Sequence, residues 1–125
     1  MSVNFVKYMF LGLIIFLIGC SSSPYSDEQR EDLALCLIDS GTIMYGAFWC
    51  SHCQDQKELF GKYAFKTFEE NEGYVECDPR GDNAQPERCL ENDVEGYPTW
   101  VFPDNSRLTG SVQLETLAGK TDCTL

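Results

Sequence analysis

The amino-acid sequence predicts a single α/β domain in which helices flank a mixed central sheet. Its 125 residues suffice for one domain with a modest apolar core, and a second domain is not expected. Segments of strand-like composition alternate with segments of helical periodicity, and two strand-like segments follow each other near the C-terminus. This order predicts a sheet that begins parallel and ends antiparallel.

The domain should open with a helix and a buried strand. Asp27 and Glu28 supply acidic side chains to the first turn of the helix, where the helix dipole favours them, and Ser40-Gly41 ends it. Residues 42–49 are rich in β-branched and aromatic side chains and nearly free of charge, which predicts a strand buried on both faces. This strand leads directly into Cys50.

The rest of the domain is predicted as one long helix followed by shorter elements. Apolar side chains recur near helical spacing from Ser51 to about Glu70, and Gly61 indicates a kink or a point of close packing. Pro86 fits the first turn of a short helix that extends through Leu90. The other predicted elements are a strand at residues 74–77, a hairpin of residues 99–102 and 107–109, and a helix at residues 112–118.

Composition limits what the surface can bind. The formal net charge is −11, and an acidic surface repels phosphate backbones, so nucleic acid is not expected as a partner. Aromatic side chains at strand or helix-face positions are expected in the core rather than on a binding surface. These are Phe48, Trp49, Phe60, Phe65, Phe68 and Trp100.

The N-terminal segment differs from the rest of the chain. Lys7 precedes an apolar run over residues 8–18, which is shorter than the about 20 residues that span a bilayer, so residues 1–19 are predicted to be an export signal. Leu17-Ile18-Gly19-Cys20 resembles the bacterial lipobox, which implies cleavage before Cys20 and a lipid on that cysteine, with an uncleaved signal anchor as the alternative. Residues 20–26 would then be a tether, and residues 27–125 an extracytoplasmic, membrane-anchored domain in a periplasm or at a cell surface.

The motif Cys50-Ser51-His52-Cys53 carries the chemistry predicted for this chain. It stands between a buried strand and a helix, which is the context of a redox pair. Unpaired N–H groups in the first helical turn stabilise an anion, so Cys50 is expected to be the nucleophile and Cys53, one turn inward, to resolve the mixed disulfide. His52 adds a donor or a positive charge beside the thiolate, which favours a donor of disulfides.

Two other uses of this motif are less favoured. A zinc site would use the same three side chains, but His52 is the only histidine and no second ligand cluster follows, so neither a metal nor another cofactor is predicted. A purely structural disulfide would not require a junction between a strand and a helix.

Removing Cys20 from the seven cysteines leaves six, an even number that suggests three disulfides in an oxidising compartment. Cys77 and Cys89 flank a loop whose closure stabilises a small domain by about 3 kcal/mol, so a structural disulfide is favoured over an electron-relay pair. Cys36 and Cys123 then pair by elimination, with a buried thiol at Cys36 or an intermolecular partner for Cys123 as alternatives.

A second motif is Tyr97-Pro98-Thr99. A proline that opens a strand after a loop is compatible with a cis peptide bond. Together with Trp49 and the Cys-x-x-Cys motif, it resembles the thioredoxin superfamily over about residues 32–118, which implies a thioredoxin-like fold. In that fold the proline loop faces the cysteine pair and the backbone before the proline binds an extended substrate. The resemblance therefore implies that Trp49, Tyr97 and Pro98 bind substrate.

A closer resemblance rests on four segments. Residues 44–50, 53–61, 74–77 and 97–100 resemble the thioredoxin-like domain fused to bacterial vitamin K epoxide reductase homologues. In that family the domain exchanges disulfides with secreted proteins and is reoxidised by a quinone-linked membrane domain. Because this sequence has no such domain, we expect a membrane reductase in trans. Thioredoxin itself has a buried acid six residues before its first active cysteine, and Met44 takes that position here.

The function predicted from these features is an extracytoplasmic thiol-disulfide oxidoreductase that oxidises or isomerises exported proteins. The nearest alternative is a thiol reductase that is supplied with electrons by a transmembrane donor. A non-catalytic lipoprotein that uses the fold as a binding module is the alternative from a different class.

Overall fold

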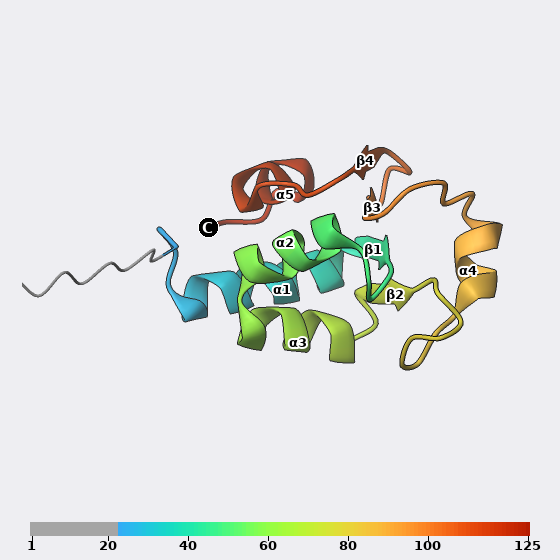
Figure 1. Cartoon of the computed structure of the whole chain (residues 1–125). Coiled ribbons are helices and arrows are strands. Elements are labelled where there is room, and N and C mark those ends of the chain that lie inside the picture. Colours follow the sequence, from blue (N-terminus) through green and yellow to red (C-terminus); the bar gives the residue numbers. More distant parts are fainter. Residues whose placement is uncertain (1–22) are drawn as a thin grey trace, which may run out of the picture.

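The computed structural model describes residues 23–125, so the predicted signal segment and Cys20 lie outside the described residues. Figure 1 shows helices and strands interspersed along the chain, with α2 followed directly by α3 and β3 directly by β4. The helices are α1 (Asp27–Ser40), α2 (Ser51–Phe60), α3 (Lys62–Glu70), α4 (Pro86–Glu91) and α5 (Leu114–Thr121). The strands are β1 (Ile43–Gly46), β2 (Tyr74–Glu76), β3 (Thr99–Val101) and β4 (Arg107–Thr109). No helix in this part of the chain is long and apolar enough to cross a membrane.

The strands form one mixed sheet in the order β2-β1-β3-β4. β1 pairs with β2 in parallel and with β3 in antiparallel orientation, and β3 pairs with β4 as a hairpin. The predicted change from parallel to antiparallel pairing is therefore confirmed. The α/β class with a mixed central sheet is confirmed with it.

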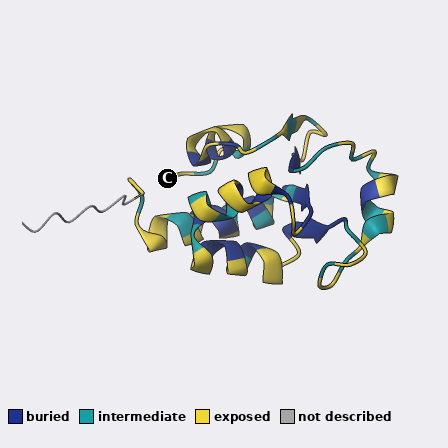
Figure 2. Cartoon of the chain, viewed as in Figure 1, coloured by how far each residue is buried: buried dark blue, intermediate teal, exposed yellow. Residues whose placement is uncertain are grey.

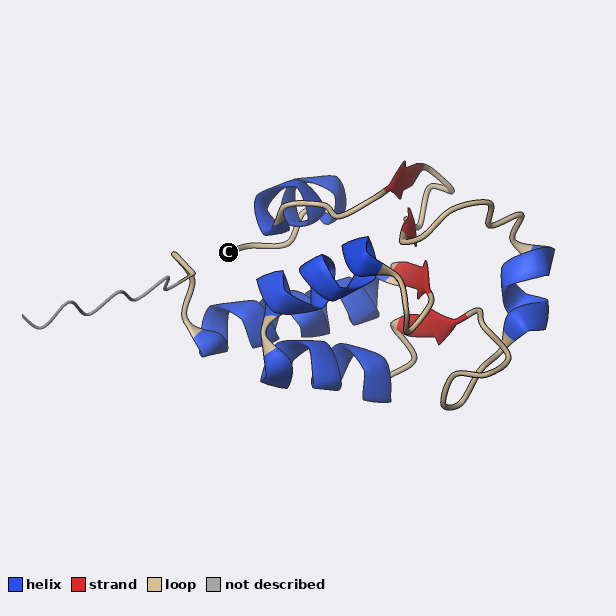
Figure 3. Cartoon of the chain, viewed as in Figure 1, coloured by secondary structure: helices blue, strands red, loops and turns tan. Residues whose placement is uncertain are grey.

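Alternate residues of the sheet enter two separate apolar clusters, because successive side chains of a strand point to opposite faces. Met44, Tyr74 and Trp100 pack among side chains of α1, α2, α3 and α5. Tyr45 and Val75 face the other way, toward the small cluster that includes the two cysteines at the end of β2 and in α4. Figure 3 shows α4 on the opposite side of β1 and β2 from α1, α2 and α3. Figure 2 shows β2 and all of β1 after its first residue as buried.

The first helix has the ends that its sequence predicts. The hydroxyl of Ser26 accepts a hydrogen bond from the backbone N–H of Gln29, whose side chain accepts one in return from the backbone N–H of Ser26. Gly41 ends the helix in the left-handed region at φ 83°. Tyr25, just before the helix, donates a hydrogen bond to Glu115 at 2.6 Å, so the last residues of the predicted tether contact α5.

The long helix predicted over residues 51–70 is two helices. Gly61 separates them with φ 78° and ψ 163°, outside the helical region. A Cβ at this position would lie 2.7 Å from a guanidinium nitrogen of Arg30, so Gly61 is also a point of close packing. The predicted strand over residues 42–49 is shorter than expected, because the chain turns after Gly46 and the N–H of Cys50 bonds to the carbonyl of Ala47 at 3.1 Å.

The last helix begins at Leu114 rather than at Val112, because both backbone groups of Val112 bond to Gln56. The side-chain amide of the fully buried Gln56 donates to the carbonyl of Val112 at 2.9 Å and accepts from its N–H at 2.7 Å. The same oxygen accepts a hydrogen bond from the indole N–H of Trp100 at 3.1 Å. One side chain of α2 thus holds both β3 and the segment before α5.

Replacing Gln56 with leucine should lower the free energy of unfolding by about 3 kcal/mol. The substitution leaves the backbone groups of Val112 and the indole N–H of Trp100 buried without partners, and each unsatisfied group costs about 1–3 kcal/mol. Urea unfolding followed by tryptophan fluorescence measures the change. Gln113→Leu, at an exposed position, is the control and should change stability by less than about 0.5 kcal/mol. Equal losses in the two variants would contradict this role of Gln56.

Candidate active site

Cys50 and Cys53 lie at the junction of β1 and α2. Cys50 is the N-cap residue of α2, with φ −73° and ψ 121°, and its Sγ accepts a hydrogen bond from the N–H of Cys53 at 3.2 Å. Both are free thiols, with Cys50 6% exposed and Cys53 fully buried. The end of a short strand therefore brings one sulfur to the helix N-terminus near the surface and keeps the other beneath it.

The surroundings of the two thiols differ. Burial, and then the hydrogen bond with Cys50, raise the pKa of the Cys53 thiol well above its usual range. A hydrogen bond with the backbone of Ala47, and then the charge of Lys57, oppose this shift only in part. Cys53 therefore remains protonated at neutral pH unless a base removes its proton. At Cys50 the helix N-terminus offers backbone N–H groups to a thiolate.

An open pocket of about 540 Å³ adjoins Cys50. It brings together residues of both predicted motifs and adds Glu95, which no sequence motif indicates as functional. The rings of Trp49 and Tyr97 meet edge to face across it, with centroids 6.0 Å apart. The residues that line it are Trp49, Cys50, Ser51, His52, Glu95, Gly96 and Tyr97.

Pro98 lies behind this pocket. The Tyr97–Pro98 peptide bond is cis, and Pro98 is almost completely buried at the start of β3. Its carbonyl accepts a hydrogen bond from the N–H of Gly110 at 2.8 Å, which connects the loop to the end of β4. The proline loop thus places Tyr97 beside Trp49.

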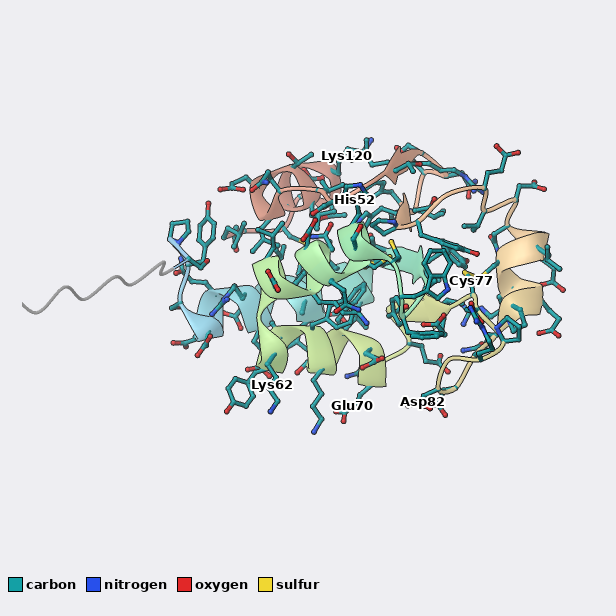
Figure 4. All side chains as sticks on the ribbon, in the orientation of Figure 1. His52, Lys62, Glu70, Cys77, Asp82 and Lys120 are labelled. Atoms are coloured by element: carbon teal, nitrogen blue, oxygen red, sulfur yellow. A yellow bond between two sulfur atoms is a disulfide. The ribbon has the colours of Figure 1, made fainter. Side chains whose placement is uncertain are left out.

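His52 lies at the exposed start of α2, as Figure 4 shows. Its Nδ1 is 3.6 Å from Oδ2 of Asp55, one turn further along the helix. When protonated, His52 would place a positive charge at the pocket, and Asp55 would partly compensate that charge.

The loop after β2 contributes a contact that sequence reasoning missed. The indole N–H of Trp49 donates to Oδ2 of Asp78 at 2.7 Å, and Arg80 pairs with the same carboxylate. Hydrogen bonds from Arg80, followed by the one from Trp49, lower the pKa of Asp78 well below its usual range. Because Trp49 and Asp78 are 29 residues apart in a loop predicted only as turns, no local pattern indicates this contact.

The prediction that six aromatic residues belong to the core is wrong for two of them. Trp49 is 57% exposed and Phe48 is 44% exposed, because the chain leaves β1 before reaching them. Arg80 lies over the ring of Phe48 at 5.8 Å. Phe60, Phe65, Phe68 and Trp100 are buried and contact one another.

The other four described cysteines form two disulfides. Cys77, after β2, is joined to Cys89 of α4, and Cys36 of α1 is joined to Cys123 of the C-terminal tail. Neither sulfur pair lines the pocket beside Cys50. Within residues 23–125, no three histidine, cysteine or acidic side chains gather as they would around a metal ion.

No family model matches the chain. Over 111 residues the sequence is 42% identical to the thiol-disulfide oxidoreductase LTO1 of Arabidopsis thaliana. The alignment covers 86% of this chain and 27% of LTO1, so the chain spans little more than a quarter of the length of that relative. The mixed sheet and the two free cysteines at the start of α2 agree with this similarity to a thiol-disulfide oxidoreductase. The chain is therefore a homologue of the thiol-disulfide oxidoreductase LTO1 with a thioredoxin-like fold.

Proposed function

We propose that this chain is an extracytoplasmic thiol-disulfide oxidoreductase that oxidises or isomerises disulfides in exported proteins. The observation that carries the proposal is the asymmetry of the cysteine pair. Cys50 lines an open pocket at a helix N-terminus, whereas Cys53 is buried behind it and retains its proton. A sulfur that lines an open pocket at a helix N-terminus, beside a protected second thiol, is the arrangement needed for a nucleophile and a resolving cysteine.

Oxidation of a substrate starts from the Cys50–Cys53 disulfide. A substrate thiolate attacks the sulfur of Cys50, the bond between the two cysteines breaks, and Cys53 leaves as a thiolate that takes up a proton. A second substrate thiolate then attacks the substrate sulfur of the mixed disulfide, which forms the substrate disulfide and releases Cys50 as a thiolate. Backbone N–H groups at the start of α2 stabilise that thiolate, which makes the disulfide a stronger oxidant.

The rim of the pocket provides a place for an extended substrate segment. Trp49 and Tyr97 offer aromatic surface in the pocket that Cys50 lines. In the described part of the chain, no main-chain group bonds to the N–H or carbonyl of Tyr97, so both are free to pair with a substrate backbone. Pro98 supports this loop from behind.

Measurement of the reduction potential tests the direction of exchange. A value near −120 mV supports an oxidant, whereas a value near −270 mV would favour the alternative of a thiol reductase supplied by a transmembrane donor. Catalysis itself is tested by refolding of a reduced disulfide-containing protein and by reduction of insulin. If the wild type and Cys50→Ser are equally active in both assays, the chain is a binding module rather than an enzyme.

We propose further that Cys20 carries a lipid and that residues 20–26 tether the domain to the outer side of a membrane. The lipobox-like sequence before Cys20 supports this arrangement. Mass spectrometry of the membrane fraction should find a chain that begins at acylated Cys20, whereas an intact Met1 terminus would support the uncleaved anchor.

Turnover of an oxidant requires an acceptor for two electrons, and we propose a quinone-linked membrane reductase in trans. A tether to the same membrane raises the effective concentration of such a partner. The exposed rings of Trp49 and Tyr97 beside Cys50 would form the docking surface. Depletion of the reductase, followed by acid trapping of thiols in cells, should leave Cys50 and Cys53 reduced. If they stay oxidised, this partnership is wrong.

A further inference from the structure

A buried tyrosine and glutamate of β2 lie in the region of Cys53, and neither of them lines the substrate pocket. Tyr74 is 7% exposed and Glu76 is 5% exposed. The hydroxyl of Tyr74 donates a hydrogen bond to Oε2 of Glu76 at 2.9 Å. The other oxygen of that carboxylate accepts the N–H of Asp78 at 2.9 Å, so both oxygens of this buried acid have a partner.

A glycine of the neighbouring strand brings Tyr74 close to the buried sulfur. A Cβ on Gly46 would lie 3.0 Å from Sγ of Cys53 and 3.2 Å from the hydroxyl oxygen of Tyr74. Both atoms therefore border the space that the absent side chain leaves open. A tyrosine hydroxyl can accept a proton from one neighbour while it donates its own to another.

The surroundings leave Cys53 with a proton that it cannot give directly to water. Cys53 is fully buried, and burial raises the pKa of its thiol. Burial and the hydrogen bond to Glu76 also raise the pKa of Tyr74, so the phenol stays neutral and can only pass a proton on. The other titratable groups that act on this region are Cys50 at the N-cap of α2, Lys57 of α2, Glu69 of α3, and Asp78 and Tyr97 in the loops after β2 and before β3.

Glu76 in turn borders a second opening in the surface. A small pocket of about 90 Å³ is lined by Tyr74 and Glu76 together with Glu69, Glu72, Asp82, Asn83 and Gln85. It shares no residue with the pocket at Cys50. Asp82, which lines it, lies well away from His52 of the substrate pocket in Figure 4. The acidic side chains that line this pocket attract a proton, so they favour its release to solvent on this side of the molecule.

We propose that Tyr74 and Glu76 form a proton-relay pair that removes the proton of Cys53 when this residue resolves a mixed disulfide at Cys50. This inference rests on the proposed exchange function and assigns the route of its proton. The S–H of Cys53 gives its proton to the hydroxyl oxygen of Tyr74, while Tyr74 gives its own proton to the carboxylate of Glu76. The Cys53 thiolate attacks Sγ of Cys50, the bond between Cys50 and the substrate sulfur breaks, and the substrate leaves as a thiolate. Tyr74 remains neutral, and Glu76 becomes a carboxylic acid that releases its proton to water in the second pocket.

The same route runs in reverse during oxidation of a substrate. Cys53 then leaves as a thiolate when the Cys50–Cys53 bond breaks, and the proton that it takes up comes from Glu76 through Tyr74. The two pockets would therefore serve different species: substrate reaches Cys50 through one, and the proton is exchanged through the other.

The test measures the resolving step alone. The full-length chain carries Cys20→Ser in every variant and is reduced before the reaction. 5,5′-Dithiobis(2-nitrobenzoic acid) then forms a mixed disulfide with Cys50 and releases one coloured thiolate. Attack by Cys53 then releases a second one. Stopped-flow absorbance separates the two phases, and the rate of the second phase is recorded as a function of pH.

Tyr74→Phe and Glu76→Gln should each slow the second phase about 100-fold at pH 7, the lower end of what a positioned acid or base contributes. The loss should shrink as pH rises, because hydroxide replaces the missing base, and the first phase should be unchanged. Tyr45→Phe removes a buried hydroxyl one residue before Gly46 on the opposite face of the sheet and serves as the matched control.

The outcomes separate the relay from the function on which it rests. Wild-type rates in both relay variants between pH 6 and pH 8, or an equal loss in Tyr45→Phe, would overturn the relay while the exchange function stands. If Cys53→Ala shows the same second phase as the wild type, the exchange function is wrong, and the relay with it.

Discussion

Replacing Cys53 with alanine should leave Cys50 covalently joined to exported proteins and abolish turnover. Cys53 is buried directly behind Cys50, and its backbone N–H bonds to the sulfur of Cys50 at 3.2 Å. A well-oriented intramolecular group corresponds to an effective concentration of about 10⁵ M or more, which thiols in solution do not approach. Without Cys53, each mixed disulfide that forms at Cys50 therefore persists.

The measurement is acid quenching of cells, alkylation of free thiols and non-reducing electrophoresis, with the trapped partners identified by mass spectrometry. Cys53→Ala should show adducts that disappear on reduction, and Cys50→Ala should show none. If Cys50→Ala traps partners and Cys53→Ala does not, the roles of the two cysteines are reversed. If neither variant traps a protein, disulfide exchange with exported proteins is not the function.

The cysteine pair could be predicted because its signal is local. A strand of uncharged, β-branched and aromatic residues followed by Cys-x-x-Cys at a helix start lies within about a dozen residues, and the structure places Cys50 as the N-cap of α2. The signals at the two ends of α1, acidic side chains in the first turn and Ser40-Gly41 at the end, are equally local, and the helix begins and ends where they predict.

The features that sequence reasoning missed depend on contacts between distant segments. Asp78 reaches Trp49 only because β2 lies beside β1 in parallel register, and the late start of α5 follows from the bonds of Gln56 to Val112. The position of Tyr74 near Cys53 depends on Gly46, which looks like an ordinary strand glycine until its neighbours are known. Such contacts follow from strand register and loop paths, which hydrophobic periodicity does not specify.

Removing the Cys36–Cys123 disulfide should lower the free energy of unfolding more than removing the other disulfide. In the chain-entropy model, a crosslink across 87 residues stabilises by about 4.6 kcal/mol, whereas the 12-residue separation of Cys77 and Cys89 gives about 3 kcal/mol. The longer crosslink joins α1 to the tail after α5 and restricts nearly the whole unfolded domain.

The variants are Cys36→Ala with Cys123→Ala, and Cys77→Ala with Cys89→Ala, so that no unpaired thiol remains at either pair. Urea unfolding with Cys50 and Cys53 kept reduced measures both losses. Neither pair lines the pocket at Cys50, so Cys50 of each double variant should react with 5,5′-dithiobis(2-nitrobenzoic acid) at the wild-type rate. This control shows that the site is still folded. A smaller loss for the Cys36 and Cys123 pair than for the Cys77 and Cys89 pair would mean that the native contacts around each disulfide, rather than the length of chain it closes, determine its contribution.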